Sequence, residues 1–207
     1  MATWMKKVYD AEGLTEYPVG PNAKYLADKF GPSGAVVLCI DVSASMSGRN
    51  LREAKKGGTG FIDDAAAGGY QVGLILWSTK IAASIPPTLD IAAVQRKLDA
   101  ADVVAATYLA PALELAHSML MAADVTDRVC VVFTDGSLSD QRQAEGAAAL
   151  LKADGIRILT IGLGNEAARG LDAIASGEPS ASASNADTLA GDMQRMASGL
   201  VASTKRK

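Results

Sequence analysis

Apolar runs of strand length alternate along this chain with segments of helical periodicity, and this alternation constrains the fold more than any other feature. Residues 35–40 form a continuous, largely β-branched apolar run, as expected for a strand that is covered on both faces. Residues 129–133 form a second run of the same kind. Strands and helices that alternate through short links build a mostly parallel sheet with helices on both faces. We therefore predict an α/β fold with a doubly wound, mostly parallel, six-stranded sheet.

The remaining elements follow the same two periodicities. Residues 49–67 have apolar positions at helical spacing, although the segment contains glycines that each cost ~1 kcal/mol relative to alanine. Residues 71–77 and 81–85 are typical of a hairpin, which makes one edge strand antiparallel, and Pro86-Pro87 is expected to end that strand. Further strands are predicted at residues 156–161 and 180–184, and further helices at residues 90–98, 109–120, 140–152, 167–175 and 185–200.

Composition narrows the class of protein. A length of 207 residues suits one large domain, and 49% hydrophobic with 21% charged residues is ordinary for a soluble globular chain. The net charge of −3 argues against a nucleic-acid binder, and no apolar run reaches the ~18 residues of a membrane span. Cys39 and Cys130 each lie inside an apolar run, where a buried, reduced thiol is expected. With no apolar core of a signal peptide near the start, these features predict a cytoplasmic protein without a nucleic-acid or membrane partner.

The first part of the chain does not share the alternation. Residues 1–33 hold half of all the aromatic residues, namely Trp4, Tyr9, Tyr17, Tyr25 and Phe30. Disordered tails are poor in aromatic residues, so we expect an ordered N-terminal extension that packs on the domain. The predicted organisation is this extension at residues 1–33, the domain at residues 34–202 and a basic tail at residues 203–207.

Hydroxyl and carboxylate side chains directly follow the two buried runs. Asp41, Ser43 and Ser45 come after the first run, Asp135 comes after the second, and Thr107 opens the helix between them. Doubly wound sheets bind ligands at the carboxyl ends of their strands, near the point where strand order reverses. Hard oxygen ligands are what Mg²⁺ requires, at ~2.1 Å in an octahedron. These three loops contain no histidine or cysteine, which argues against zinc.

The pattern Asp-x-Ser-x-Ser, a later threonine and then Thr-Asp-Gly resembles the metal-ion-dependent adhesion site of von Willebrand factor type A domains. The resemblance covers about residues 34–202, and it implies the doubly wound fold of that family. It also implies five metal-site residues: Asp41, Ser43, Ser45, Thr107 and Asp135. By this resemblance the two serines coordinate the ion directly. The threonine does so directly or through water, and the two aspartates act mainly through waters and hydrogen bonds.

One position departs from the pattern of the family. Many relatives have a glycine pair before the threonine, whereas this chain has Ala105-Ala106. Alanine does not readily adopt a positive φ, so the loop before Thr107 is expected to be stiffer or differently shaped.

The leading functional hypothesis is a non-enzymatic, Mg²⁺-dependent protein-binding module, with Mn²⁺ or Ca²⁺ as alternative ions. A carboxylate from a partner protein would complete the coordination of the ion, and the resemblance suggests an AAA+ ATPase complex as partner. The alternative is a metal-dependent hydrolase or phosphotransferase, which would need a second catalytic group near the ion. His117 lies about three helical turns beyond Thr107, so we expect a surface or packing role for it. A third reading is a purely structural domain with no metal dependence.

Overall fold

The computed structural model describes residues 31–103, 107–136, 138–177, 182–185 and 188–204. The account below concerns Pro32–Lys207, the second of the two units into which the chain divides. Residues 1–30 and 205–207 lie outside the described residues, so the packing of the N-terminal extension stays a prediction. In chain order the elements are β1 (Gly34–Asp41), the 3₁₀ turn η1 (Ala44–Met46), α2 (Arg49–Ala67), β2 (Tyr70–Trp77), β3 (Ile81–Thr88), α3 (Ile91–Asp99), α4 (Ala110–Ala122), β4 (Arg128–Thr134), α5 (Gln141–Ala153), β5 (Arg157–Leu163), α6 (Asn165–Asp172), β6 (Ser182–Ser184) and α7 (Leu189–Thr204).

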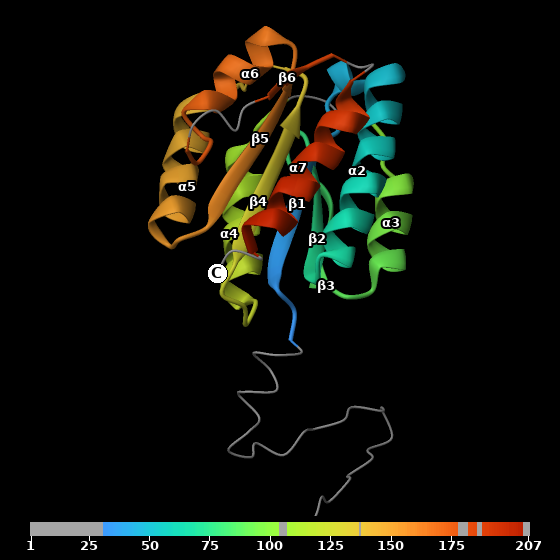
Figure 1. Cartoon of the computed structure of the whole chain (residues 1–207). Helices are drawn as coiled ribbons and strands as arrows, with labels where there is room; N and C mark the ends of the chain where they lie inside the picture. Colours follow the sequence, from blue (N-terminus) through green and yellow to red (C-terminus); the bar gives the residue numbers. More distant parts are fainter. Residues whose placement is uncertain (1–30, 104–106, 137, 178–181, 186–187, 205–207) are drawn as a thin grey trace, which may run out of the picture. The chain divides into compact units, whose positions relative to one another are not determined.

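The strands form one six-stranded sheet in the order β3-β2-β1-β4-β5-β6 (Figure 1). Only β3 runs antiparallel to its neighbour, and the other four pairings are parallel. The predicted fold class is therefore confirmed. The chain builds outward from β1 in one direction and then outward from β4 in the other. Strand order consequently reverses between β1 and β4, which are the two continuous apolar runs of the sequence.

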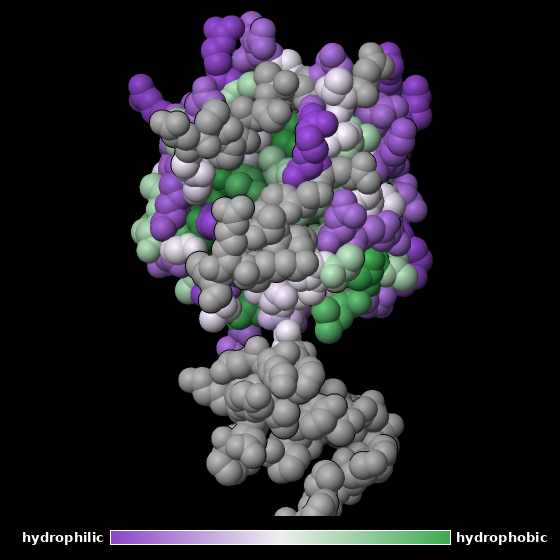
Figure 2. All heavy atoms as spheres, viewed as in Figure 1, coloured by the Kyte–Doolittle hydropathy of each residue, from purple (hydrophilic) through white to green (hydrophobic). Residues whose placement is uncertain are grey.

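Helices cover both faces of the sheet because successive side chains of each strand point to opposite faces. On one face, alternate residues of β1 (Val36, Leu38 and Ile40) pack with α2, α3 and α7. On the other face, the intervening residues (Ala35, Val37 and Cys39) pack with α4, α5 and the end of α6. Figure 2 shows hydrophilic side chains along the side where α2 and α3 run, as expected for the solvent-facing sides of covering helices.

The glycines of α2 do not interrupt the helix, and the packing around them explains why they are tolerated. A Cβ atom on Gly57 would lie 2.7 Å from the Met193 sulfur and 3.0 Å from Ala190 Cα, both on α7. A Cβ atom on Gly58 would lie 2.9 Å from Leu98 of α3. Glycine therefore lets two helices approach α2 closely, and this packing offsets the low helix propensity of glycine.

The edge strand differs from its sequence-based prediction. We expected Pro86-Pro87 to end the strand, whereas β3 continues through both prolines to Thr88. Proline is compatible with a strand at the edge of a sheet, where one side of the backbone has no partner strand. The pairing of β3 with β2 also contains register shifts, which accommodate the missing donors.

The two cysteines are buried and free, as predicted. Their sulfur atoms lie 3.9 Å apart on the neighbouring strands β1 and β4. The hydrogen bond between the two thiols and the burial of Cys39 both raise the pKa of Cys39 well above its ordinary value. A thiol with a raised pKa is a poor nucleophile, so this pair serves as part of the core.

Candidate metal centre

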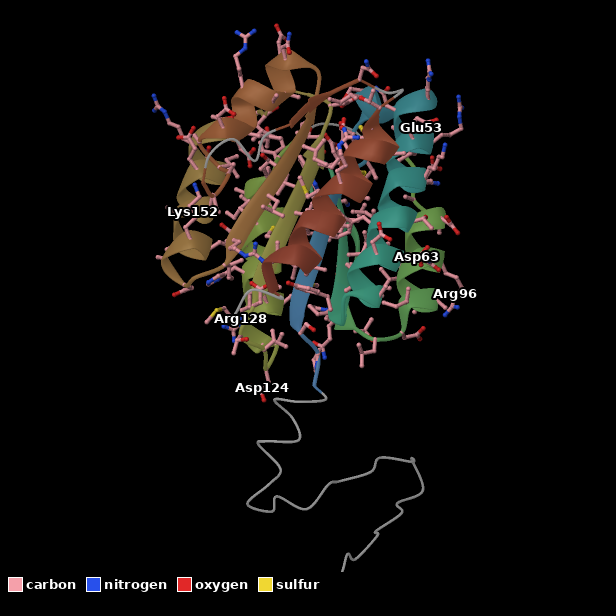
Figure 3. All side chains as sticks on the ribbon, viewed as in Figure 1. Glu53, Asp63, Arg96, Asp124, Arg128 and Lys152 are labelled. Atoms are coloured by element: carbon pink, nitrogen blue, oxygen red, sulfur yellow. The ribbon has the colours of Figure 1, made fainter. Side chains whose placement is uncertain are left out.

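The predicted site lies where the strand order reverses. Asp41 is the last residue of β1, and Asp135 directly follows β4, its parallel neighbour. Their strands end on the same edge of the sheet, toward the top of Figure 1. In Figure 3 Glu53 of α2 lies toward this edge, whereas Arg128, at the start of β4, lies at the opposite end. The prediction that the two aspartates lie at neighbouring strand ends is therefore confirmed.

Asp41 is fully buried and accepts two hydrogen bonds from neutral groups. Its Oδ1 accepts the backbone N–H of Ser43 at 2.7 Å, and its Oδ2 accepts the Thr134 hydroxyl at 2.6 Å. Burial raises the pKa of Asp41 above its ordinary value, the hydrogen bonds from Thr134 and Ser43 oppose that rise, and the charge of Asp135 adds to it. Asp41 thus orients the start of the serine loop and carries a negative charge that its surroundings compensate poorly.

The two serines form a hydrogen-bonded link to the second aspartate. The short turn η1 brings Ser43 Oγ within 3.0 Å of Ser45 Oγ. Ser45 Oγ in turn donates to Asp135 Oδ1 at 2.7 Å. Ser43 is almost fully buried, whereas Ser45 is exposed, so the link runs from the interior to the surface. Asp41, Ser43, Ser45 and Asp135 therefore form one group, which we call the oxygen cluster.

Two polar residues that we did not assign to the site support the oxygen cluster. Asn50, in the first turn of α2, donates from Nδ2 to Asp135 Oδ2 at 2.9 Å. Thr134, which precedes Asp135, donates to Asp41 as described above. The sequence signal for Thr134 was its place in the Thr-Asp-Gly segment. Asn50 gave no signal of its own, because its contact depends on where α2 begins.

The fifth predicted residue, Thr107, is joined through its backbone to the loop that follows Asp135. Thr107 is half-buried just before α4, and its carbonyl accepts the N–H of Ser139 at 3.0 Å. Ser139 belongs to the loop that follows Asp135, so the two loops are joined. Ala105-Ala106 and Ser137 lie outside the described residues, and the direct contact of Thr107 with an ion stays a prediction.

The chemistry of the oxygen cluster fits a hard divalent cation. It offers two hydroxyls and two carboxylates, which are ligand types that Mg²⁺ accepts. Among the described residues, no three His, Cys, Asp or Glu side chains gather in a way that could hold a metal ion. A metal at these strand ends would use the serine hydroxyls together with the two carboxylates, and this ligand set stays a prediction. The close approach of two carboxylates, with a raised pKa at Asp41, would be relieved by a dication.

His117 lies on α4 and pairs with Asp154, just past the end of α5, at 2.6 Å from Nε2 to Oδ2. Both side chains are partly exposed, which fits the surface role predicted for this histidine.

The described part of the chain contains no helix that is long and apolar enough to cross a membrane.

The fold and the oxygen cluster define a doubly wound α/β domain with a candidate cation site at its topological switch point. Residues 35–196 match the family model of the von Willebrand factor type A domain, and the chain belongs to this family. No relative is found among curated protein sequences.

Several solved structures share this fold at low sequence identity. The chain is similar to the von Willebrand factor domain of the type V pili tip protein Mfa5 from Porphyromonas gingivalis, at 14% identity and a TM-score of 0.76 over 84% of this chain and 96% of that one. It is also similar to proximal thread matrix protein 1 from the mussel byssus, in a structure with zinc in its metal-ion-dependent adhesion site, at 19% identity and a TM-score of 0.71. That match covers 82% of this chain and 46% of the mussel protein, so the chain spans about half of the length of that relative. The protein BatB from Bacteroides thetaiotaomicron matches at 16% identity and a TM-score of 0.67, over 84% of this chain and 100% of that one.

Proposed function

We propose that this domain is a Mg²⁺-dependent protein-binding module that engages a glutamate or aspartate of a partner protein. The observation that carries the proposal is the oxygen cluster, in which the hydrogen bonds from described residues to Asp41 and Asp135 come from neutral donors. Two carboxylates that receive no cationic side chain from the described residues favour the uptake of a dication. The ion supplies positive charge at the surface end of the cluster, where a carboxylate of the partner can bind.

The site residues have different roles, which depend on their charge and burial. Ser43 and Ser45 are the neutral hydroxyls that would hold the ion, together with Thr107. Asp41 is buried behind them and fixes the serine loop through the backbone of Ser43. Neutral hydroxyl ligands leave the ion electrophilic on its exposed side, and this property attracts an acidic partner.

The types of donor atom at the site determine which ion it would prefer. The oxygen-only donor set favours Mg²⁺, with Mn²⁺ or Ca²⁺ as alternatives. The mussel relative carries zinc in its adhesion site, so the ion bound here has to be measured against zinc as well.

The partner surface includes the residue that follows Thr107. Tyr108 is 40% exposed, and its backbone N–H is fixed by the Ser78 carbonyl at 2.9 Å. An aromatic side chain on an anchored backbone is typical of the residues that dominate protein interfaces. We propose that the domain acts without catalysis in the cytoplasm, and an AAA+ ATPase complex is the partner class that the family resemblance suggests.

The test is capture of partners from the native cell with Mg²⁺ and again with a chelator. The captured partner is then measured against wild type and Asp41→Ala, each with and without Mg²⁺. Among these four measurements, we expect partner binding only for wild type with Mg²⁺. A further variant, Tyr108→Ser, should lower the affinity for the partner and leave the affinity for the ion unchanged. Equal affinity in all four measurements would show that the partner uses another surface. Mg²⁺-dependent turnover of a phosphate ester that is lost in Asp41→Ala would instead favour the hydrolase alternative.

A further inference from the structure

Asp140 is a buried carboxylate that the proposed function does not use. It is 5% exposed and directly precedes α5. Its Oδ1 accepts the N–H of Leu109 at 2.9 Å, and its Oδ2 accepts the N–H of Ala110 at 2.8 Å. Both amides belong to the start of α4, which is 30 residues or more earlier in the chain. One carboxylate therefore joins the start of α4 to the start of α5.

The start of α4 has no cap of its own, which explains why it needs Asp140. The first N–H groups of a helix have no partner within the helix, and Ser, Thr, Asp or Asn usually supplies one from the preceding position. Here that position is Leu109, which has no polar side chain. Asp140 satisfies two of these amides from another element, and its negative charge lies at the positive ends of two helix dipoles.

The same contacts fix the segment that carries Thr107. The Thr107 carbonyl accepts the N–H of Ser139, and the Tyr108 N–H donates to the Ser78 carbonyl. With the two bonds to Asp140, each residue from 107 to 110 has a backbone group held by another loop. Ser139 and Asp140 lie in the loop that begins at Asp135, so the threonine loop is attached to the loop of the second aspartate.

We propose that Asp140 is a positioning residue that sets the ion affinity of the domain by holding Thr107 beside the oxygen cluster. This inference rests on the proposed function, because it assigns Asp140 an effect on ion binding. It adds that residues 107–110 and 139–140 act as one unit, which is held together by a carboxylate that does not touch the ion.

The first test is the affinity of the full chain for Mg²⁺ and Mn²⁺, measured by calorimetry on wild type and Asp140→Asn. The substitution keeps the size of the side chain but replaces one acceptor oxygen by an NH₂ group, which cannot accept an amide hydrogen. We expect about a tenfold loss of affinity, at the lower end of the effect of residues that orient metal ligands.

Asp90→Asn is the matched control, because Asp90 caps α3 through the N–H of Ala93 at 3.0 Å and α3 carries no residue of the site. It should leave ion affinity unchanged. A double variant then tests the route of the effect. If Asp140 acts through Thr107, Asp140→Asn adds little to the loss caused by Thr107→Val. Additive losses, or unchanged affinity in Asp140→Asn, would overturn the inference while the proposed function stands.

A second measurement does not depend on the ion. Amide hydrogen exchange of the chelated protein should be faster at Leu109 and Ala110 in Asp140→Asn than in wild type, with no change in the strands. Equal exchange at these amides would contradict the clamp. A wild type that binds neither ion would overturn the proposed function, and the role of Asp140 in ion affinity with it.

Discussion

Aspartates lie at both ends of the central strands, and the chain treats their charge in two different ways. At the amino end, Asp127 precedes β4. It accepts hydrogen bonds from the Arg157 guanidinium, the shortest of which measures 2.8 Å, and another from the Tyr70 hydroxyl. At the carboxyl end, Asp41 and Asp135 receive hydroxyl, amide and backbone N–H donors from the described residues.

This difference separates a structural charge from a functional one. A carboxylate that is paired with a guanidinium has its charge balanced within the fold. At the other end, the described donors to Asp41 and Asp135 are neutral, so none of them balances the charge of these carboxylates. The carboxyl end is therefore prepared for a cation from solution, whereas the amino end already has one.

The largest expected effect tests the uncompensated charge directly. Asp41→Asn keeps an acceptor for the Ser43 N–H but removes one negative charge, so we expect roughly a 100-fold loss of Mg²⁺ affinity, the upper end for groups that orient metal ligands. Calorimetric titration measures the loss. The matched control is Asp63→Asn, an exposed aspartate on α2 that accepts from Gln95. Unchanged affinity in Asp41→Asn would mean that the two ends do not differ in the way described.

A second variant makes the carboxyl end resemble the amino end. Asn50→Lys places an ammonium group beside Asp135, as Arg157 lies beside Asp127, and we expect about a tenfold loss of Mg²⁺ affinity. Asn50→Ala is its control, because it removes the hydrogen bond to Asp135 without adding a charge. A loss in Asn50→Lys no larger than that in Asn50→Ala would show that charge balance does not decide ion binding.

The converse variant removes the cation of the amino end. Arg157→Met should lower the free energy of unfolding by about 1 kcal/mol, since the pair is partly exposed and Tyr70 still donates to Asp127. Urea unfolding with and without Mg²⁺ measures the change, which should be the same in both conditions. A Mg²⁺-dependent difference would tie the amino end to the ion and remove the contrast.

The smallest effect is on pH dependence. Because burial raises the pKa of folded Asp41 above its ordinary value, the ionised form destabilises the ion-free fold at pH values above the folded pKa. This penalty should disappear as the pH falls through the folded pKa toward the ordinary value. The unfolding free energy of chelated wild type should therefore rise relative to Asp41→Asn over that interval. A difference that stays constant with pH would contradict the raised pKa.

The sequence predicted the parts of this molecule that depend on periodicity. The continuous apolar runs at residues 35–40 and 129–133 identified β1 and β4, and their buried character placed Asp41 and Asp135 on one edge. The antiparallel hairpin was also predicted, although its second strand is longer than expected.

The supporting contacts could not be predicted in the same way, for a physical reason. Asn50 meets Asp135 only because α2 begins at Arg49, and Asp140 meets Leu109 only because α4 and α5 pack together. Each contact joins residues 30 or more positions apart through side chains whose types are common in loops and caps. A sequence pattern does not show which of these distant residues come close in space, because the fold determines that.

The two edges of the sheet affect how this domain behaves when many copies are crowded together. An open edge strand is a template on which another chain can add a strand, and this is a common start of aggregation. Here β3 contains consecutive prolines, and the described part of β6 is three residues long. Because neighbouring residues direct their N–H groups to opposite sides of a strand, one of these prolines removes a donor from the free edge. Backbone pairing between copies is therefore discouraged along the β3 edge.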